Sequence, residues 1–469
     1  MTNKLSSRWF WSSLTAATLL LASTGAYAQP PPPDQPAPPP PPPEVTPPPP
    51  SPPPPPPPPA VTPSASEGAA IPYPHMGKTH EIMVGPDTWF RLGVQIQAWA
   101  LYLQSPTTLA NGDQGGYSFD LYLRRARFFI GAQIMKGVGA FVLFDSPNLG
   151  RTTQTGAGTE MSPFVTSKNF SPAIVQDAFA EVKLAGDAFM LEAGLMVVPF
   201  SHNGLQSTSS YLPLDVANTA AVLVATSTSV LRDTGFQLKG YELDDHLEWR
   251  LFIGSGLRQP AHDTVPLAHN APRVTGHVQY QILDLDAKGY VYSGMTYGKR
   301  KLLGVSAGFD WQKGDDIGTG TTNSYYGISA GVFGAYPLAG DPSPKGGDEI
   351  AYEAEFYRYD GGVPSPGGTG SATFAIPKQN DFNVEVAYYN KDASLGVFGK
   401  FELAKYDDDS KALGAAGSKM WIGGGVKYFV QESLCNFTLF YQRTQFPDAD
   451  DTKVNGVNQF TLQLQAFYY

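Results

Sequence analysis

Apolar and polar residues alternate in stretches of roughly ten residues that recur from Thr88 to Tyr469, with clusters of Gly, Asp, Asn and Ser between them. The pattern is clearest from Gln459 to Tyr468, where every even-numbered residue is apolar and the odd-numbered residues up to Gln465 are polar. Because successive side chains of a strand point to opposite faces, each stretch predicts a strand with one apolar and one polar face. No stretch beyond the N-terminal segment is apolar for long enough to cross a membrane as a helix. Alternating strands are instead typical of a transmembrane β-barrel, whose outside meets lipid and whose interior is polar.

We therefore expect an all-β fold, a closed antiparallel transmembrane barrel of about sixteen strands, since only closure satisfies every backbone group in lipid. The expected strands are Phe90–Tyr102, Phe119–Ile134, Val138–Asp145, Ile174–Leu184, Phe189–Val198, Val230–Gly240, Leu247–Gly254, Arg273–Leu283, Leu302–Gln312, Tyr325–Tyr336, Glu349–Tyr359, Phe382–Asn390, Leu395–Tyr406, Met420–Val430, Leu434–Arg443 and Val457–Tyr468. The segment Tyr290–Tyr297 is open to two interpretations, a long turn or part of the ninth strand.

The lengths of the predicted connections support this fold independently. Short connections such as 135–137, 185–188, 391–393 and 431–433 alternate with long ones such as 146–173 and 199–229. A barrel with a periplasmic N-terminus has short turns on that side and long loops outside, and an even strand count brings both termini to one side. A soluble β-sandwich or propeller, the alternative fold, would not produce this alternation.

Three segments precede the predicted barrel domain, residues 88–469. Residues 1–28 have the pattern of a cleaved signal peptide, with Lys4 and Arg8 before an apolar run and Ala26-Tyr27-Ala28 at the cleavage site. Residues 29–64 are largely proline, which favours polyproline II and cannot join a sheet. We favour a disordered, inert linker there over a semi-rigid spacer that contacts the cell wall. Residues 65–87 form a polar approach segment.

Composition and charge exclude several classes of function. The formal charge of −10 and the isoelectric point of about 5.2 provide no dominant basic face for nucleic acid. The hydrophobic fraction of 42% is too low for a helical membrane protein but suits a barrel, in which only alternate residues meet lipid. The single cysteine, Cys435, excludes an internal disulfide. The seven histidines lack metal-ligand spacing, so we expect no metal and no other cofactor.

Charged residues on the polar strand faces are the candidate pore-lining residues. Arg125 and Arg127 share one face of the second predicted strand. Asp177 and Glu181 share one face of the fourth, and Arg232 lies near the start of the sixth. A basic residue on the lipid face would cost about 2–4 kcal/mol at the membrane midplane, so these charges mark the interior, where they bias ion entry.

Arg124 does not fit this arrangement, because it has the parity of the apolar residues Ala126 and Phe128. It must therefore lie near a rim, in a subunit interface or beside a local bulge.

Two segments, Gly304–Gly308 and Gly327–Gly331, match the G-x-S-x-G pattern of a serine hydrolase. That pattern carries catalysis only at a sharp turn between a strand and a helix. Ser306 and Ser329 fall in the middle of predicted strands, on the polar face, and no helical pattern follows. We therefore interpret both segments as small residues on barrel strands and expect no enzymatic activity.

Four short segments, in order along the predicted barrel, resemble motifs of one known family. Leu123–Arg127 resembles the paired-arginine strand of the phosphate-selective porin O and P family, and Gly194–Ser201 is similar to that family's glycine-to-Pro-Phe-Ser strand end. Arg232–Leu238 and Gly423–Phe429 resemble its Arg-Asp-x-Gly strand and its late glycine-tyrosine strand. The resemblance implies a sixteen-stranded, usually trimeric pore with a third loop folded inward. Val197 stands where the family often has lysine, and inward acids balance the arginines, so only a mild anion preference is expected.

Together these observations predict an outer-membrane porin of a Gram-negative bacterium that admits small hydrophilic solutes or ions by passive diffusion, with anions such as phosphate among them. Part of 199–229 is expected to narrow the pore. The expected partners are outer-membrane lipid, the barrel-assembly machinery and further copies of the chain in a homotrimer. The barrel-assembly machinery would recognise the C-terminal aromatic residues. Two alternatives stay open: a structural tether that uses the proline-rich arm, and, less favoured, an outer-membrane barrel hydrolase.

Overall fold

The computed structural model describes residues 81–106, 114–154, 166–168, 173–221, 231–256, 271–286, 288–313, 324–361, 378–408, 417–448 and 454–469. The chain divides into two units, Met1–Thr62 and Pro63–Tyr469, and every described residue belongs to the second. The predicted signal peptide, the proline-rich segment and most of the approach segment lie outside the described residues. Within the described ranges, no helix is both long and apolar enough to cross a membrane.

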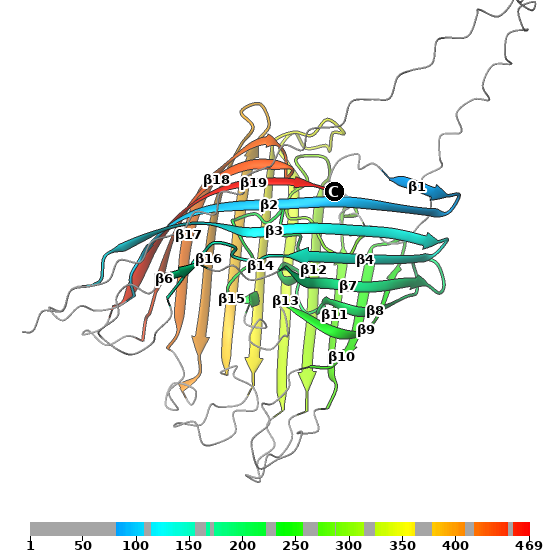
Figure 1. The fold of residues 1–469 in the computed structure, drawn as a ribbon, viewed down its shortest axis with the longest axis horizontal. Helices are drawn as coiled ribbons and strands as arrows, with labels where there is room; N and C mark the ends of the chain where they lie inside the picture. The colour runs from blue at the N-terminus through cyan, green and yellow to red at the C-terminus, as the bar shows by residue number, and fades with distance from the viewer. Residues whose placement is uncertain are drawn as a thin grey trace, which may run out of the picture. The chain divides into compact units, whose positions relative to one another are not determined.

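The second unit contains a closed antiparallel β-barrel (Figure 1). Its main sheet has 17 strands, of which β1 pairs only with β2, so that sixteen strands form the ring. The ring consists of β2 (Thr88–Gln104), β3 (Tyr117–Met135), β4 (Val138–Asp145), β7 (Ile174–Lys183), β8 (Met190–Val197), β9 (Arg232–Glu242), β10 (Leu247–Gly254), β11 (Arg273–Gln281), β12 (Leu302–Gln312), β13 (Tyr325–Pro337), β14 (Glu349–Asp360), β15 (Gln379–Asn390), β16 (Leu395–Tyr406), β17 (Lys419–Gln431), β18 (Cys435–Gln445) and β19 (Gly456–Tyr468). Neighbours in the chain pair with one another, and β19 pairs with β2 to close the ring. In Figure 1 the front strands β2–β4 cross the rear strands β12–β16 steeply, because the strands of a closed barrel are tilted.

Each of the sixteen predicted strands overlaps one strand of the ring, so the predicted fold class is confirmed. The structure adds three strands that the pattern did not predict: β1 (Ile82–Gly85), β5 (Thr152–Gln154) and β6 (Thr166–Lys168). The pairing of β1 runs from Ile82 with Phe90 to Gly85 with Thr88, whereas β19 pairs with β2 only as far as Val94. Part of the predicted approach segment therefore continues the sheet where β19 has ended.

The two rims of the barrel differ in the length of their connections. At the rim where β2 begins, the short-turn rim, brief connections such as 136–137, 391–394 and 432–434 join successive strands. At the opposite rim, the long-loop rim, the connections are longer, as in 146–173 and 198–231. Two connections depart from this rule, since 282–301 between β11 and β12 and 338–348 between β13 and β14 are long although they start from the short-turn rim.

The alternation in the sequence becomes an alternation of exposure in the barrel wall. In β19, Leu462 and Leu464 are 51% and 43% exposed, whereas the side chains between and after them, Gln463 and Gln465, are each 2% exposed. The expected orientation of these residues is therefore confirmed. Apolar side chains cover the outside and polar side chains fill the inside, which suits a barrel surrounded by lipid.

Candidate functional site

Two connections fold into the barrel interior, one from each rim. The first, the inner loop, comprises the described residues 198–221 of the connection between β8 and β9. The second, the inner turn, comprises the described residues 282–286 and 288–301 between β11 and β12. The sequence pattern predicted only the inner loop, as the part of 199–229 that narrows the interior. Residues 222–229 of that expected segment lie outside the described residues.

Both ends of the inner loop are attached to carboxylates on the inner face of β14 and β16. The backbone N–H of His202 donates to Glu355 at 2.8 Å. Near the other end, the backbone N–H of Thr219 donates to Glu402 at 2.9 Å. Glu355 and Glu402 are 1% and 0% exposed, and buried carboxylates are stable only when donors surround them. These contacts therefore fix the loop against an acidic wall.

The middle of the inner loop crosses to arginines on β3. Asp215 accepts hydrogen bonds from Arg124 at 3.0 and 2.8 Å and from Arg125 at 2.5 Å. The hydroxyl of Thr208 accepts a hydrogen bond from Arg127 at 2.6 Å. The inner loop thus connects a basic wall on β3 with an acidic wall on the opposite strands. Two of the predicted pore-lining residues, Arg125 and Arg127, belong to this basic wall.

A β-bulge in β3 turns Arg124 toward the interior. Gln97 of β2 pairs with Arg125, whereas the next residue, Ala98, pairs with Leu123, so Arg124 is an additional residue in the ladder. A bulge of this kind changes which face a side chain takes. Of the three expected explanations for this arginine, the bulge is the one that the structure supports.

The remaining predicted residues, Asp177, Glu181 and Arg232, also face the interior, but they do not oppose the β3 arginines. Arg232 donates to Asp177 at 3.2 Å. Lys239 of β9 donates to Glu181 at 3.1 Å and to Glu192 at 2.7 Å. Asp177 and Glu181 of β7 are therefore paired with cations of β9, two strands away in the same part of the wall, and not with the arginines of β3. Lys239 was missed although it shares the odd parity of Asp233, Gln237 and Tyr241, which are also buried in β9.

The acids that do face the basic wall were not predicted. They lie on three adjacent strands and are each 1% exposed or less: Glu353, Glu355, Asp381, Glu385 and Glu402. A signal was present, because the odd-numbered residues of β14 share the inward parity and include three glutamates. Asp215 carried no such signal, since it lies in a connection without strand periodicity.

The inner turn meets the inner loop through backbone hydrogen bonds in the middle of the barrel. The N–H of Ser207 donates to the carbonyl of Tyr292 at 2.8 Å, and the N–H of Tyr292 donates to the carbonyl of Leu205 at 2.9 Å. The hydroxyl of Tyr290 donates to Asp177 at 2.7 Å. The segment 290–297 is therefore neither a simple turn nor part of β12, but a second segment packed inside the barrel.

Lysine–aspartate contacts tie the inner turn to the short-turn rim. Nζ of Lys288 lies 2.8 Å from Asp187 and 2.7 Å from Asp245, and Nζ of Lys183 lies 2.7 Å from Asp187. Burial alone would raise the pKa of Asp187, but the hydrogen bonds from the two lysines outweigh it and lower that pKa. Burial would lower the pKa of Lys288, but its two aspartate partners raise it. The contacts therefore favour the charged form of each partner.

Aromatic side chains fill the interior near the short-turn rim. The last residue, Tyr469, is 1% exposed, and its ring centroid lies 5.6 Å from that of Phe129 and 6.3 Å from that of Phe141. Gly131 provides the space, because a Cβ there would lie 2.0 Å from the hydroxyl oxygen of Tyr469. The neighbouring Tyr468 points outward and is 51% exposed. Two of the C-terminal rings thus belong to opposite sides of the wall.

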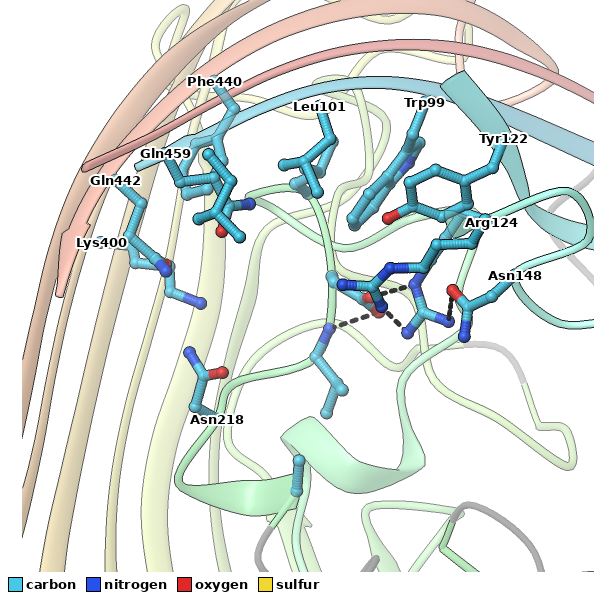
Figure 2. Close-up of a pocket in the computed structure, with 16 residues that line it drawn as sticks. Trp99, Leu101, Tyr122, Arg124, Asn148, Asn218, Lys400, Phe440, Gln442 and Gln459 are labelled. Carbon is cyan, nitrogen blue, oxygen red and sulfur yellow. Dashed lines mark hydrogen bonds and ion pairs between the residues drawn. The ribbon is translucent and has the colours of Figure 1, made fainter. Parts of the chain in front are cut away.

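A chamber of about 310 Å³ lies between the inner loop and the strand ends at the long-loop rim. Figure 2 shows Trp99, Tyr122 and Arg124 on one side of this chamber and Lys400 and Gln442 on the other. The inner loop supplies its floor with residues 214–216, 218 and 221. The chamber therefore combines aromatic, cationic and amide groups.

The two G-x-S-x-G segments lie within strands. The hydroxyl of Ser329 in β13 donates to the carbonyl of Phe200 at 2.6 Å, and Ser306 in β12 pairs with Gly331 of β13. Neither serine is at a turn between a strand and a helix. Within the part of the chain that the structure describes, no group of three or more His, Cys, Asp or Glu residues is arranged to hold a metal ion.

Comparison with solved structures places the fold among bacterial barrels. The chain is similar to OprB of Pseudomonas putida in a high-pH structure, with 9% identity and a TM-score of 0.51 over 81% of this chain and 94% of that one. It is also similar to the outer membrane channel DcaP of Acinetobacter baumannii, with 12% identity and a TM-score of 0.49 over 82% and 99% of the two chains. Salmonella typhi OmpF in complex with daunomycin shares 14% identity at a TM-score of 0.48 over 83% and 100%. No protein-family model and no curated protein matches the sequence. At such low identity, the likeness to OprB shows the fold alone, a closed antiparallel β-barrel.

Proposed function

We propose that this protein is an outer-membrane porin through which small hydrophilic solutes and ions diffuse passively. The observation that carries the proposal is the polarity of the barrel, whose wall is apolar on the outside and charged on the inside. The inner loop crosses this interior from the basic wall to the acidic wall. An apolar outer band suits lipid, and interior charges guide solutes through a barrel of this size. The short-turn rim then faces the periplasm and the long-loop rim faces the medium, as in other bacterial barrels.

The interior charges support a weak preference among ions rather than strong selection. Asp215 neutralises part of the charge of Arg124 and Arg125, and Asp145 accepts a hydrogen bond from Arg127 at 2.9 Å. The acidic wall faces the same space, and within it Lys400 contacts Glu402. Such a transverse field orients dipolar solutes, while salt screening over about 8 Å weakens selection by sign. We therefore expect weak selection by sign, with a mild anion preference only where the arginines reach the narrowest part of the path, and with phosphate as one admissible anion.

The two inner segments support a narrow path. The inner loop and the inner turn are joined by backbone hydrogen bonds at Leu205, Ser207 and Tyr292, so together they occupy the middle of the barrel. A channel with two such segments should conduct less than a barrel narrowed by one loop alone.

The location and the partners belong to the same proposal. Outer-membrane lipid would surround the apolar outside, and the barrel-assembly machinery would insert the chain into the outer membrane of a Gram-negative bacterium. The family resemblance of the sequence motifs favours a homotrimer. No part of this proposal requires a cofactor.

Planar-bilayer recording of the purified protein in KCl tests the proposal. Stepwise conductance is expected, with a reversal potential in a salt gradient that indicates a slight preference for chloride. Arg125→Gln together with Arg127→Gln should reduce that preference, whereas Arg443→Gln, on the outer parity of β18, should leave it unchanged. Absence of conductance from folded, inserted protein would refute the porin function, and strong cation selectivity would refute the role given to the arginines.

A further inference from the structure

The chamber above the inner loop has one continuous apolar wall. Trp99, Leu101, Tyr122 and Phe440 line it and are each 7% exposed or less, so their side chains are held by packing. The indole N–H of Trp99 donates to Gln463 at 2.7 Å, which fixes the orientation of its ring. A fixed aromatic surface suits a ligand with a flat apolar ring, because such a surface binds without losing side-chain freedom.

The charges that line the chamber are predominantly positive. The lining contains three cationic side chains, Arg124, Arg151 and Lys400, and one carboxylate, Asp215. Both oxygens of Asp215 accept hydrogen bonds from Arg124 and Arg125, so this carboxylate is already neutralised. A ligand in the chamber therefore meets a positive field, which favours an anion.

Arg151 is the cation best placed to bind such an anion. Within the described ranges it forms no ion pair, whereas Arg124 is bound to Asp215 and Lys400 contacts Glu402. Its guanidinium carbon lies 5.3 Å from the ring centroid of Tyr122, which positions the group beside the aromatic wall. Guanidinium binds carboxylate through two parallel hydrogen bonds, so a carboxylate attached to a ring would satisfy both features at once.

The size and the remaining polar groups narrow the class of ligand. A volume of about 310 Å³ is at the lower end of the range of roughly 300–1,000 Å³ for small-molecule pockets. The amides of Asn148, Asn218, Gln442 and Gln459 complete the lining and offer hydrogen bonds to ring substituents. A free phosphate would leave the aromatic wall unused, and a neutral sugar would leave Arg151 without an anionic partner.

We propose that this chamber is a binding site for small aromatic carboxylates, which it captures at the long-loop rim before they pass the inner loop. The proposal rests on the porin function and names a substrate class for it. Arg151 binds the carboxylate, and the ring of the ligand packs against the apolar wall that Trp99, Leu101, Tyr122 and Phe440 form. Both groups face one cavity, so a ring and a charge on the same molecule bind more tightly than either alone.

Single-channel recording and calorimetry test the site separately from conduction. Benzoate is expected to interrupt the KCl current and to bind the detergent-solubilised protein. Acetate, which has the charge alone, and benzyl alcohol, which has the ring alone, should do so at least about tenfold more weakly, a difference of about 1.4 kcal/mol. Arg151→Gln should weaken benzoate binding in the calorimeter by about tenfold. Arg443→Gln, which removes an arginine from the outer parity of β18, is the matched control.

The outcomes distinguish this proposal from the porin function. Benzoate binding in the calorimeter without any KCl conductance would support the site and refute the porin. Conductance that benzoate does not interrupt, together with no heat of binding, would refute the site alone. Equal binding of phosphate, or of a neutral methyl glucoside, would refute the requirement for both a ring and a carboxylate. Unchanged benzoate affinity in Arg151→Gln would refute the role of that arginine.

Discussion

Replacing Asp215 with Asn removes the one carboxylate that the inner loop offers to the basic wall. Asp215 lies 2.8 Å from Arg124 and 2.5 Å from Arg125, so two guanidiniums and one carboxylate form a group of net charge +1. The substitution raises that charge to +2. An anion about 6 Å away gains about 0.7 kcal/mol from one additional charge in water-like surroundings, which corresponds to about a threefold increase in its local concentration. Screening at physiological salt lowers the factor to about two.

Reversal potentials in KCl gradients measure this effect directly. The same charge lowers the local concentration of potassium by the same factor, so the permeability ratio of chloride to potassium should rise about ninefold at low salt and about fourfold near physiological salt in D215N. Asp245→Asn is the control, because it removes an equal charge at the short-turn rim, where the side chain of Asp245 is 37% exposed. An unchanged ratio, a shift toward potassium, or an equal shift in D245N would refute the placement of this charge in the conducting path.

Three further predictions concern the packed interior and its rim. Tyr290→Phe removes the hydrogen bond that the hydroxyl donates to a β7 carboxylate at 2.7 Å and the one that it accepts from a β8 backbone N–H at 2.5 Å. The free energy of unfolding should therefore fall by about 1–3 kcal/mol in urea titrations followed by tryptophan fluorescence. An unchanged unfolding midpoint would contradict this prediction. Gly131→Val places a Cβ within 2.0 Å of the Tyr469 hydroxyl and should lower the free energy of unfolding by about 1–3 kcal/mol. In a double-mutant cycle, Tyr469→Ala should restore most of this loss. Additive losses would show that the two sites are not in contact. The pKa of Asp187 is lowered in the folded protein. Its contribution of about 0.2–1 kcal/mol to the free energy of unfolding is therefore present above the unfolded pKa near 3.9 and is lost as the pH falls below that value. Asp187→Asn should abolish this part of the pH dependence of stability.

The sequence was sufficient for most of the barrel wall because most wall residues follow a period of two. In β19, the parity of Leu462 and Gln463 alone predicts which side chain faces outward, and the structure agrees. The bulge at Arg124 interrupts this rule, since one inserted residue shifts the parity of the ladder without leaving a mark in the pattern. Parity therefore located the inward arginines but left one of them unexplained.

The site was harder to predict because it is built from connections rather than strands. Asp215 and Tyr292 lie in segments without periodicity, and their partners are determined by the closure of the barrel, which brings distant strands together. The segment 290–297 contains three tyrosines and one glycine, a composition that fits a turn as well as a packed interior. The neutralisation of Asp177 by Arg232 was likewise invisible, because it depends on which strands are neighbours across the inner face.

The inner loop also changes the conformational entropy that the unfolded chain loses when the barrel closes. Closing the ring brings Gln97 and Gln465 together, which are 368 residues apart in the sequence. The contacts of the loop span less, 91 residues from Arg124 to Asp215 and 184 residues from Asn218 to Glu402. Since the entropy lost on closing a flexible chain grows with the logarithm of its length, contacts to the loop divide one large closure into smaller ones. The same segment that narrows the interior thus acts as an internal scaffold, on which the first and the last strands can be brought into register before they pair.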